Sequence, residues 1–172
     1  MPQIWRIRLA NIEYDGGKKV YTDELFRLRG KNGLINLANG GGKTLLVQLL
    51  LQAVLPNESF NKRRVADLLA NKRYTGHIAV EWRLDSPETE LLTTGFCFTR
   101  GAEEDGRLRY FMYTIQYAQP NEFDIKNLPL VKEQVPITYA ELLNLLRQNT
   151  GSAEARISVF DQDDKYRAYG QE

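Results

Sequence analysis

Residues 33–56 read GLINLANGGGKTLLVQLLLQAVLP, and this stretch decides the fold that the sequence predicts. Its first part, 34–37, is a short apolar run typical of a buried strand. Three glycines follow at 40–42, and residues 44–55 have the apolar density of a buried helix that ends at Pro56. The stretch therefore predicts a strand, a glycine-rich loop and a helix in immediate succession.

The loop between this strand and helix has the residue types that bind a chain of phosphates. Glycines let backbone amides point inward, and the free amides and dipole of the following helix favour an anion. A lysine neutralises the β- and γ-phosphates during phosphoryl transfer, and a hydroxyl is a ligand for Mg²⁺. The predicted nucleotide-binding residues are Asn39, Gly40, Gly41, Gly42, Lys43, Thr44 and Leu45, with Lys43 as the catalytic residue and Thr44 as a metal ligand.

The loop departs from the general pattern G-x-x-x-x-G-K-[ST] at one position. The first glycine of that pattern would stand at residue 37, where the chain has Leu37. This leucine either extends the buried strand or distorts the start of the loop. Three glycines and a lysine also suit a plain surface turn. The position between a buried strand and an apolar helix favours nucleotide binding.

The rest of the chain predicts a mixed α/β pattern without the regular alternation of a doubly wound fold. A strand and a tight turn at 15–17 begin a hairpin, and Thr138 and Glu141 have the spacing of a capping box at the start of a helix. A polar connection spans 119–134. Strands are predicted at 4–14, 20–21, 77–84, 91–99, 107–118 and 157–160, and further helices at 64–72 and from 163 onward.

Composition excludes several classes of protein. The 172 residues include 23 Lys+Arg and 22 Asp+Glu, so the formal net charge of +1 argues against a uniformly basic nucleic-acid binder. Cys97 is the single cysteine and His77 the single histidine, which excludes a disulfide framework and a zinc site rich in these residues. No apolar stretch approaches the roughly 20 residues of a membrane span. We expect a cytoplasmic protein without a membrane partner.

The form N-G-x-G-K-[ST], with Asn39 directly before the glycines, resembles the ABC-type ATPases of chromosome maintenance. These are the SMC proteins, their repair relatives and the MukB-type condensin, and Wadjet-type defence ATPases are similar in the same way. The resemblance spans about residues 4–118. It includes the strand at 7–11, the helix at 46–56 and the strands around 80–83 and 96–100.

This resemblance implies an α/β fold, the N-terminal lobe of a P-loop NTPase head of the ABC/SMC type with an antiparallel β subdomain. Residues 1–172 would form one such lobe, cut off before a coiled coil. The implied cofactors are ATP and Mg²⁺. The implied partners are a C-terminal head lobe, a second head, DNA and accessory subunits, in the bacterial nucleoid. The implied function is ATP binding and hydrolysis that moves or clamps DNA in chromosome maintenance or in defence against plasmids and phages.

In this family the C-terminal lobe supplies a Ser-Gly-Gly signature, an apolar strand that ends in Asp-Glu, and a switch histidine. The chain has no Ser-Gly-Gly, and His77 precedes the place of a switch histidine. We therefore expect the isolated chain to bind nucleotide weakly and to hydrolyse it negligibly.

Two further groups of residues have open interpretations. At the end of the strand at 157–160, Asp161 could hold Mg²⁺ through water, Gln162 could be the family's metal-binding glutamine, or the strand could simply end before an acidic helix. A basic cluster follows the loop helix, and its members either form a solvated helix face or contact phosphate or DNA. These members are Arg63, Arg64, Lys72 and Arg73.

Two rival functions also fit the sequence. The chain could be a self-contained P-loop ATPase or nucleotide kinase, for which Arg100, Arg107 and Arg109 are the available lid arginines. It could instead be a non-catalytic module that binds DNA or a protein partner and carries a degenerate loop, as Leu37 would suggest.

Overall fold

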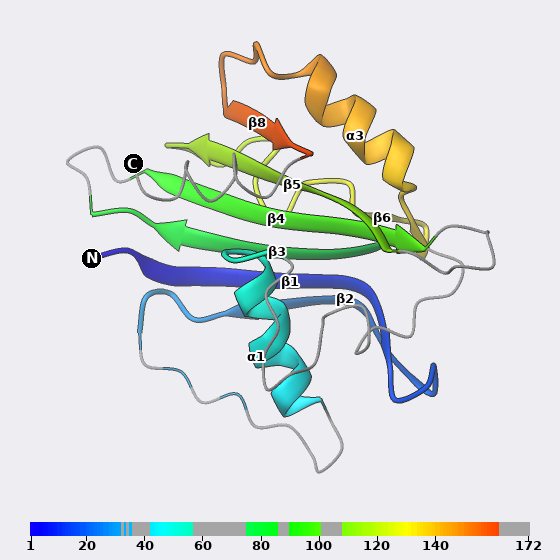
Figure 1. Cartoon of the computed structure of the whole chain (residues 1–172). Helices are drawn as coiled ribbons and strands as arrows, with labels where there is room; N and C mark the ends of the chain where they lie inside the picture. Colours follow the sequence, from blue (N-terminus) through cyan, green and yellow to red (C-terminus); the bar gives the residue numbers. More distant parts are fainter. Residues whose placement is uncertain are drawn as a thin grey trace.

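The computed structural model describes residues 1–31, 33, 35, 42–56, 75–85, 90–100 and 108–161. Its centre is a six-stranded sheet with helix α1 (Lys43–Gln52) on one face and helix α3 (Tyr139–Gln148) on the other (Figure 1). The strands of this sheet are β1 (Gln3–Tyr14), β2 (Lys19–Arg27), β3 (Gly76–Arg83), β4 (Leu91–Arg100), β5 (Leu108–Tyr117) and β8 (Arg156–Phe160). A separate small pair consists of β6 (Val131–Lys132) and β7 (Val135–Pro136).

All neighbouring strands of the large sheet are antiparallel, in the order β2-β1-β3-β4-β5-β8. β1 and β2 form the predicted hairpin, and its turn contains Asp15, Gly16 and Gly17, all with positive φ. β3, β4 and β5 follow one another as neighbours. The predicted strands at 4–14, 77–84, 91–99, 107–118 and 157–160 are confirmed within one or two residues.

The predicted α/β fold of a P-loop NTPase lobe is wrong. Such a lobe is built around parallel strands covered by helices, whereas the described residues form a β-rich domain with antiparallel pairing throughout and two helices. The residue patterns found the individual strands and the first hairpin, but they do not determine which distant strands pair. The predicted strand at 34–37 lies outside the described residues except for Ile35, and so do the predicted helices at 64–72 and from 163.

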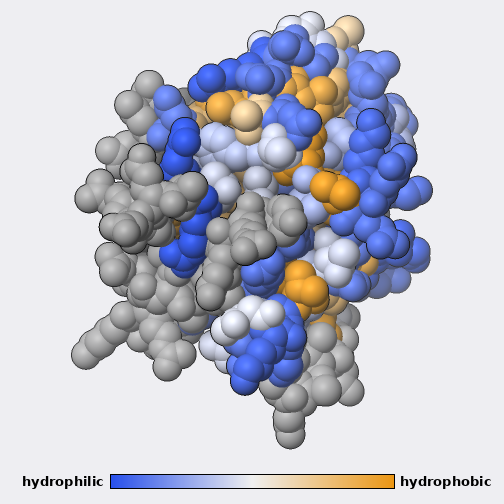
Figure 2. Space-filling model, turned by 90° about the vertical axis from the view of Figure 1, so that its right-hand side faces the viewer, coloured by the Kyte–Doolittle hydropathy of each residue, from blue (hydrophilic) through white to orange (hydrophobic). Residues whose placement is uncertain are grey.

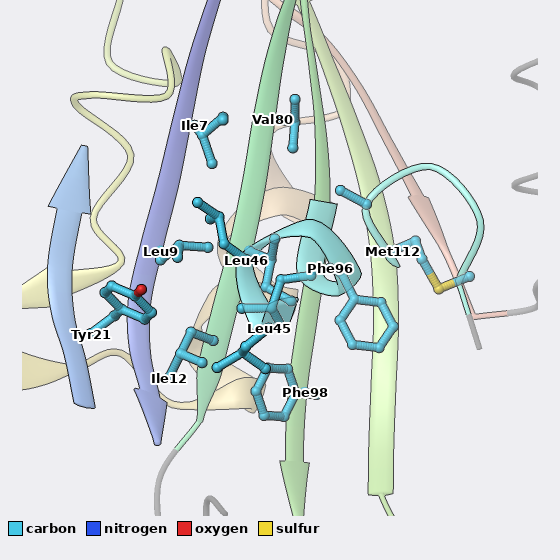
Figure 3. Packing of buried hydrophobic residues seen from close by; sticks show 13 residues of the cluster. Ile7, Leu9, Ile12, Tyr21, Leu45, Leu46, Val80, Phe96, Phe98 and Met112 are labelled. Atoms are coloured by element: carbon cyan, nitrogen blue, oxygen red, sulfur yellow. The ribbon is translucent and has the colours of Figure 1, made fainter. Parts of the chain in front are cut away.

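Helix α1 packs on the sheet through leucines spaced by three and four residues. Leu45, Leu46 and Leu49 are at most 8% exposed. Figure 3 shows Leu45 and Leu46 directed at side chains from β1 and β4, among them Leu9 and Phe96. The helix follows the hairpin in sequence and returns to cover it, so its first residues lie beside the hairpin turn. This packing places residues 42–45 of the predicted site beside the hairpin.

The opposite face is covered by α3 and by residues 118–137, which lead into it. The predicted capping box is present, because the Glu141 amide donates to Thr138 Oγ1 at 3.2 Å and the Thr138 amide donates to Glu141 Oε2 at 2.9 Å. Leu142 and Leu146 of this helix are fully buried. The Arg8 guanidinium of β1 donates to three backbone carbonyls of 125–128 and so ties this segment to the sheet.

Close contact between β4 and β5 requires glycine at position 95. Gly95 is the cross-strand partner of Tyr113, whose ring is fully buried. A methyl group on Gly95 would overlap this ring, which is held by the core around it. We expect Gly95→Ala to lower the free energy of unfolding by about 2–3 kcal/mol.

Urea unfolding followed by circular dichroism measures this loss. Gly151→Ala is the matched control, since a methyl group there meets no atom within 4 Å. Equal stability of the two variants would contradict the packing that we describe.

Candidate functional site

The hairpin turn and the start of α1 enclose a hollow of about 400 Å³. Two segments that are distant in sequence line it. The hairpin contributes Tyr14, Asp15 and Lys19, and the start of the helix contributes Gly42, Lys43, Thr44 and Leu45. Figure 2 views the molecule from the hairpin end, where the described surface is mostly hydrophilic and the hydrophobic areas are small and separate.

Helix α1 begins at a glycine in the left-handed conformation. Gly42 has φ 80 and ψ 26, and its carbonyl accepts the first helical hydrogen bond from the Leu46 amide at 2.8 Å. Within the described residues, the three preceding helix amides at 43–45 have no hydrogen-bond partner, and no side chain caps them. Free amides at a helix N-terminus attract an anion.

The hairpin packs so closely against this glycine that a side chain would not fit without a shift. A Cβ on Gly42 would lie 3.2 Å from the Tyr21 hydroxyl and 3.3 Å from the Tyr14 ring. The two tyrosine rings stack with centroids 5.3 Å apart. Burial, together with the neighbouring Tyr14, raises the pKa of Tyr21 to about 12, so its hydroxyl stays protonated. The tyrosine pair therefore fixes the helix start against the hairpin.

Charge in the hollow is uneven. Lys19 pairs with Asp15 at 3.6 Å. Lys43 is exposed and has no ion-pair partner among the residues that the structure describes. The Lys43 ammonium group stands at the positive end of the helix dipole, and the first turn of α1 has no acidic residue to offset it. This arrangement disfavours folding. An anionic ligand in the hollow would remove this repulsion.

The structure brings together only part of the predicted site. Gly42, Lys43 and Thr44 line the hollow, with the Lys43 and Thr44 side chains exposed, while Leu45 is buried and offers only its amide. Three loop residues lie outside the described part of the chain, as do the second candidate metal ligand, Gln162, and the basic cluster. These residues are Asn39, Gly40, Gly41, Gln162, Arg63, Arg64, Lys72 and Arg73.

Sequence reasoning missed the hairpin side of the hollow. Tyr14, Asp15 and Lys19 flank a glycine turn that the sequence did predict, but no local pattern shows that this turn meets the start of α1. A possible signal is the tyrosine directly before Asp15-Gly16-Gly17, since an aromatic residue at a strand end is often packed against a neighbouring element.

The described residues contain no group of three or more His, Cys, Asp or Glu side chains that could hold a metal ion. A magnesium ion bound with a nucleotide needs fewer protein ligands, because phosphate oxygens and water supply the others. The exposed hydroxyl of Thr44 at the helix start fits that requirement.

Three buried residues with ionisable side chains, Glu81, His77 and Cys97, lie away from the hollow. Glu81 has no exposed side-chain surface and accepts two hydrogen bonds from Arg6, at 2.6 and 2.7 Å, and one from the Tyr117 hydroxyl. His77 is fully buried, and burial lowers its pKa to about 4, so it is neutral at pH 7. Cys97 is also fully buried, and burial raises the pKa of its thiol. None of these residues lines the hollow.

Among the described residues, no helix is long and apolar enough to cross a membrane. No protein-family model matches the chain, and no curated protein matches it either.

Proposed function

We propose that the hollow at the start of α1 binds the phosphates of a nucleoside triphosphate, with ATP as the nucleotide and Mg²⁺ as its counterion. The observation that carries this proposal is the coincidence of sequence and geometry at residues 42–44. A Gly-Lys-Thr sequence starts a helix whose first amides have no described partner, and an exposed ammonium group stands in the hollow beside them. Because the sheet is antiparallel, the fold does not support nucleotide binding, and the proposal rests on these residues.

Each group has a defined task in this proposal. The amides at 43–45 donate to phosphate oxygens, and the Lys43 ammonium offsets the charge of the terminal phosphates. The Thr44 hydroxyl is a ligand for Mg²⁺, which links the phosphates to the protein. The Tyr14 ring forms the hairpin wall of the hollow, where the base or ribose of the nucleotide would lie.

We expect this chain to bind ATP but to hydrolyse it negligibly. Among the residues that the structure describes, Asp15 is the only carboxylate that lines the hollow, and it is paired with Lys19. The described lining residues therefore supply no other carboxylate that could act as a general base for the attacking water. This supports weak binding with negligible hydrolysis by the isolated chain.

The resemblance noted above leads to a proposal for the whole protein. It would couple ATP hydrolysis to action on DNA in the cytoplasm, at the nucleoid, with a C-terminal head lobe, a second head and accessory subunits as partners. The self-contained enzyme is less well supported, because Arg109 of its proposed lid stacks on the Tyr139 ring, with the guanidinium carbon 5.5 Å from the ring centroid.

The magnesium dependence of ATP binding tests the role of Thr44. We expect Mg²⁺ to strengthen ATP binding to the wild type and to have little effect on Thr44→Val, which keeps the shape and removes the hydroxyl. Thr44→Ser is the matched control and should retain the magnesium effect. Displacement of a fluorescent ATP analogue, with and without Mg²⁺, measures all three proteins. An equal magnesium effect in Thr44→Val and the wild type would contradict this assignment.

A further inference from the structure

Three exposed arginines lie at the end of the sheet that is opposite the hollow. They stand where β2 and β3 end beside the first residues of β1, at the left in Figure 1. Arg27 is the cross-strand partner of Arg6, and Arg83 is the partner of Gln3. The amide of Arg29 donates to the Trp5 carbonyl at 3.0 Å. We call Trp5, Arg27, Arg29 and Arg83 the Trp5 patch.

An irregularity in β1 places Trp5 in this patch. The register of β1 with β3 shifts between Ile4 and Arg6, so Trp5 is the extra residue of a bulge. Its side chain is half-buried, and the guanidinium carbon of Arg83 lies 5.3 Å from its ring centroid. Arg83 is exposed, so one face of its planar guanidinium is available beyond the tryptophan.

The charges of this patch are not compensated within the described part of the chain. Arg27, Arg29 and Arg83 form no ion pair there. By contrast, the neighbouring Arg6 and Arg8 are both paired with carboxylates. The near-zero net charge of the chain therefore includes a local excess of positive charge.

The Trp5 patch and the hollow are too far apart to bind one nucleotide together. Tyr14 follows Trp5 by nine positions along β1, about 30 Å at the rise of an extended strand. A single nucleotide in the hollow does not reach the Trp5 patch. Any ligand of the Trp5 patch is therefore a different molecule from the nucleotide in the hollow.

We propose that the Trp5 patch binds single-stranded nucleic acid. Arg27 and Arg29 contact backbone phosphates, for which the guanidinium fork is well suited. An unpaired base stacks on the Arg83 guanidinium that Trp5 supports. The stacking component selects single strands, because the bases of a duplex are already stacked on one another. This inference is independent of nucleotide binding in the hollow.

The test compares two triple variants with equal loss of charge. Arg27→Ala/Arg29→Ala/Arg83→Ala removes the patch, and Lys132→Ala/Arg147→Ala/Arg156→Ala removes exposed cations from β6, α3 and β8. Binding of a fluorescent 20-nucleotide dT strand is measured by anisotropy over a range of salt concentrations. We expect the patch variant to bind about tenfold more weakly or worse. The slope of its plot of log affinity against log salt should be smaller in magnitude by about 1.4, because two phosphate contacts to a single strand are lost. The control variant should stay within about threefold of the wild type.

Two additional measurements distinguish the alternatives. The wild type should prefer the single strand to the matching duplex, and Trp5→Phe should bind the strand better than Trp5→Ala, with thermal melting used to verify that both fold. Mg-ATP binding of the patch variant should equal that of the wild type, so the two proposals fail separately. Equal weakening by both triple variants, a preference for duplex, or binding only to vesicles containing phosphatidylserine would overturn the proposal.

Discussion

Replacement of Arg6 by methionine is expected to lower the free energy of unfolding by about 3–5 kcal/mol. Arg6 forms two hydrogen bonds with Glu81, whose side chain has no exposed surface. Burial lowers the pKa of Arg6, but the hydrogen bonds and charge of Glu81 outweigh it and raise this pKa above its ordinary value. Methionine retains much of the packing and removes the charge, so the Glu81 carboxylate would be buried beside Tyr117 without a cation.

Chemical unfolding at pH 7 measures this effect, and two variants control for it. Arg27→Met changes the arginine directly opposite Arg6 on β2, which is exposed and unpaired among the described residues, and should cost less than about 0.5 kcal/mol. Arg6→Met/Glu81→Gln removes both charges and should recover most of the loss. A double variant no more stable than Arg6→Met would show that an uncompensated charge is not the cause.

Replacement of Lys43 by alanine is expected to weaken Mg-ATP binding by about tenfold to a hundredfold. A hydrogen bond to a charged group contributes about 1.5–3 kcal/mol, and each 1.4 kcal/mol is a factor of ten in affinity. Lys43 is exposed and opens α1 at its positive end, so its removal should not destabilise the fold. Loss of binding can therefore be attributed to the site.

The matched control for this variant is Lys132→Ala, which removes an exposed lysine of β6 outside the hollow. Both variants lose one positive charge, so a general electrostatic effect would weaken them equally. Affinity measured by displacement of a fluorescent ATP analogue should fall for Lys43→Ala alone. If Lys43→Ala bound Mg-ATP as tightly as the wild type, the assignment of Lys43 to the proposed site would be wrong.

The sequence predicted the local elements of this fold well, because each has a signal of its own. Runs rich in Val, Thr, Phe and Tyr marked β3, β4 and β5, and Thr138 with Glu141 marked the start of α3. Pairing between distant strands was not predictable in this way. β1 pairs with β2 in the predicted hairpin, whereas its pairing with β3 joins residues more than 60 positions apart.

The candidate site was predictable only on the side that carries a motif. Gly42, Lys43 and Thr44 followed from the chemistry of phosphate binding, and the structure places them at one hollow. Tyr14 and Lys19 belong to this hollow because α1 folds back over the hairpin, which no nearby residue pattern reveals. The bulge at Trp5 likewise depends on pairing with β3, so no local pattern reveals that Ile4 packs with the core on the face of Ile7.

The central claim is that the start of α1 binds a nucleoside triphosphate. Calorimetric titration of the purified chain with Mg-ATP tests it most directly, with AMP as the ligand that lacks the β- and γ-phosphates. We predict saturable binding of one Mg-ATP per chain, in the micromolar to millimolar range, and much weaker binding of AMP. Absence of saturable Mg-ATP binding, or equal affinity for AMP, would contradict the account.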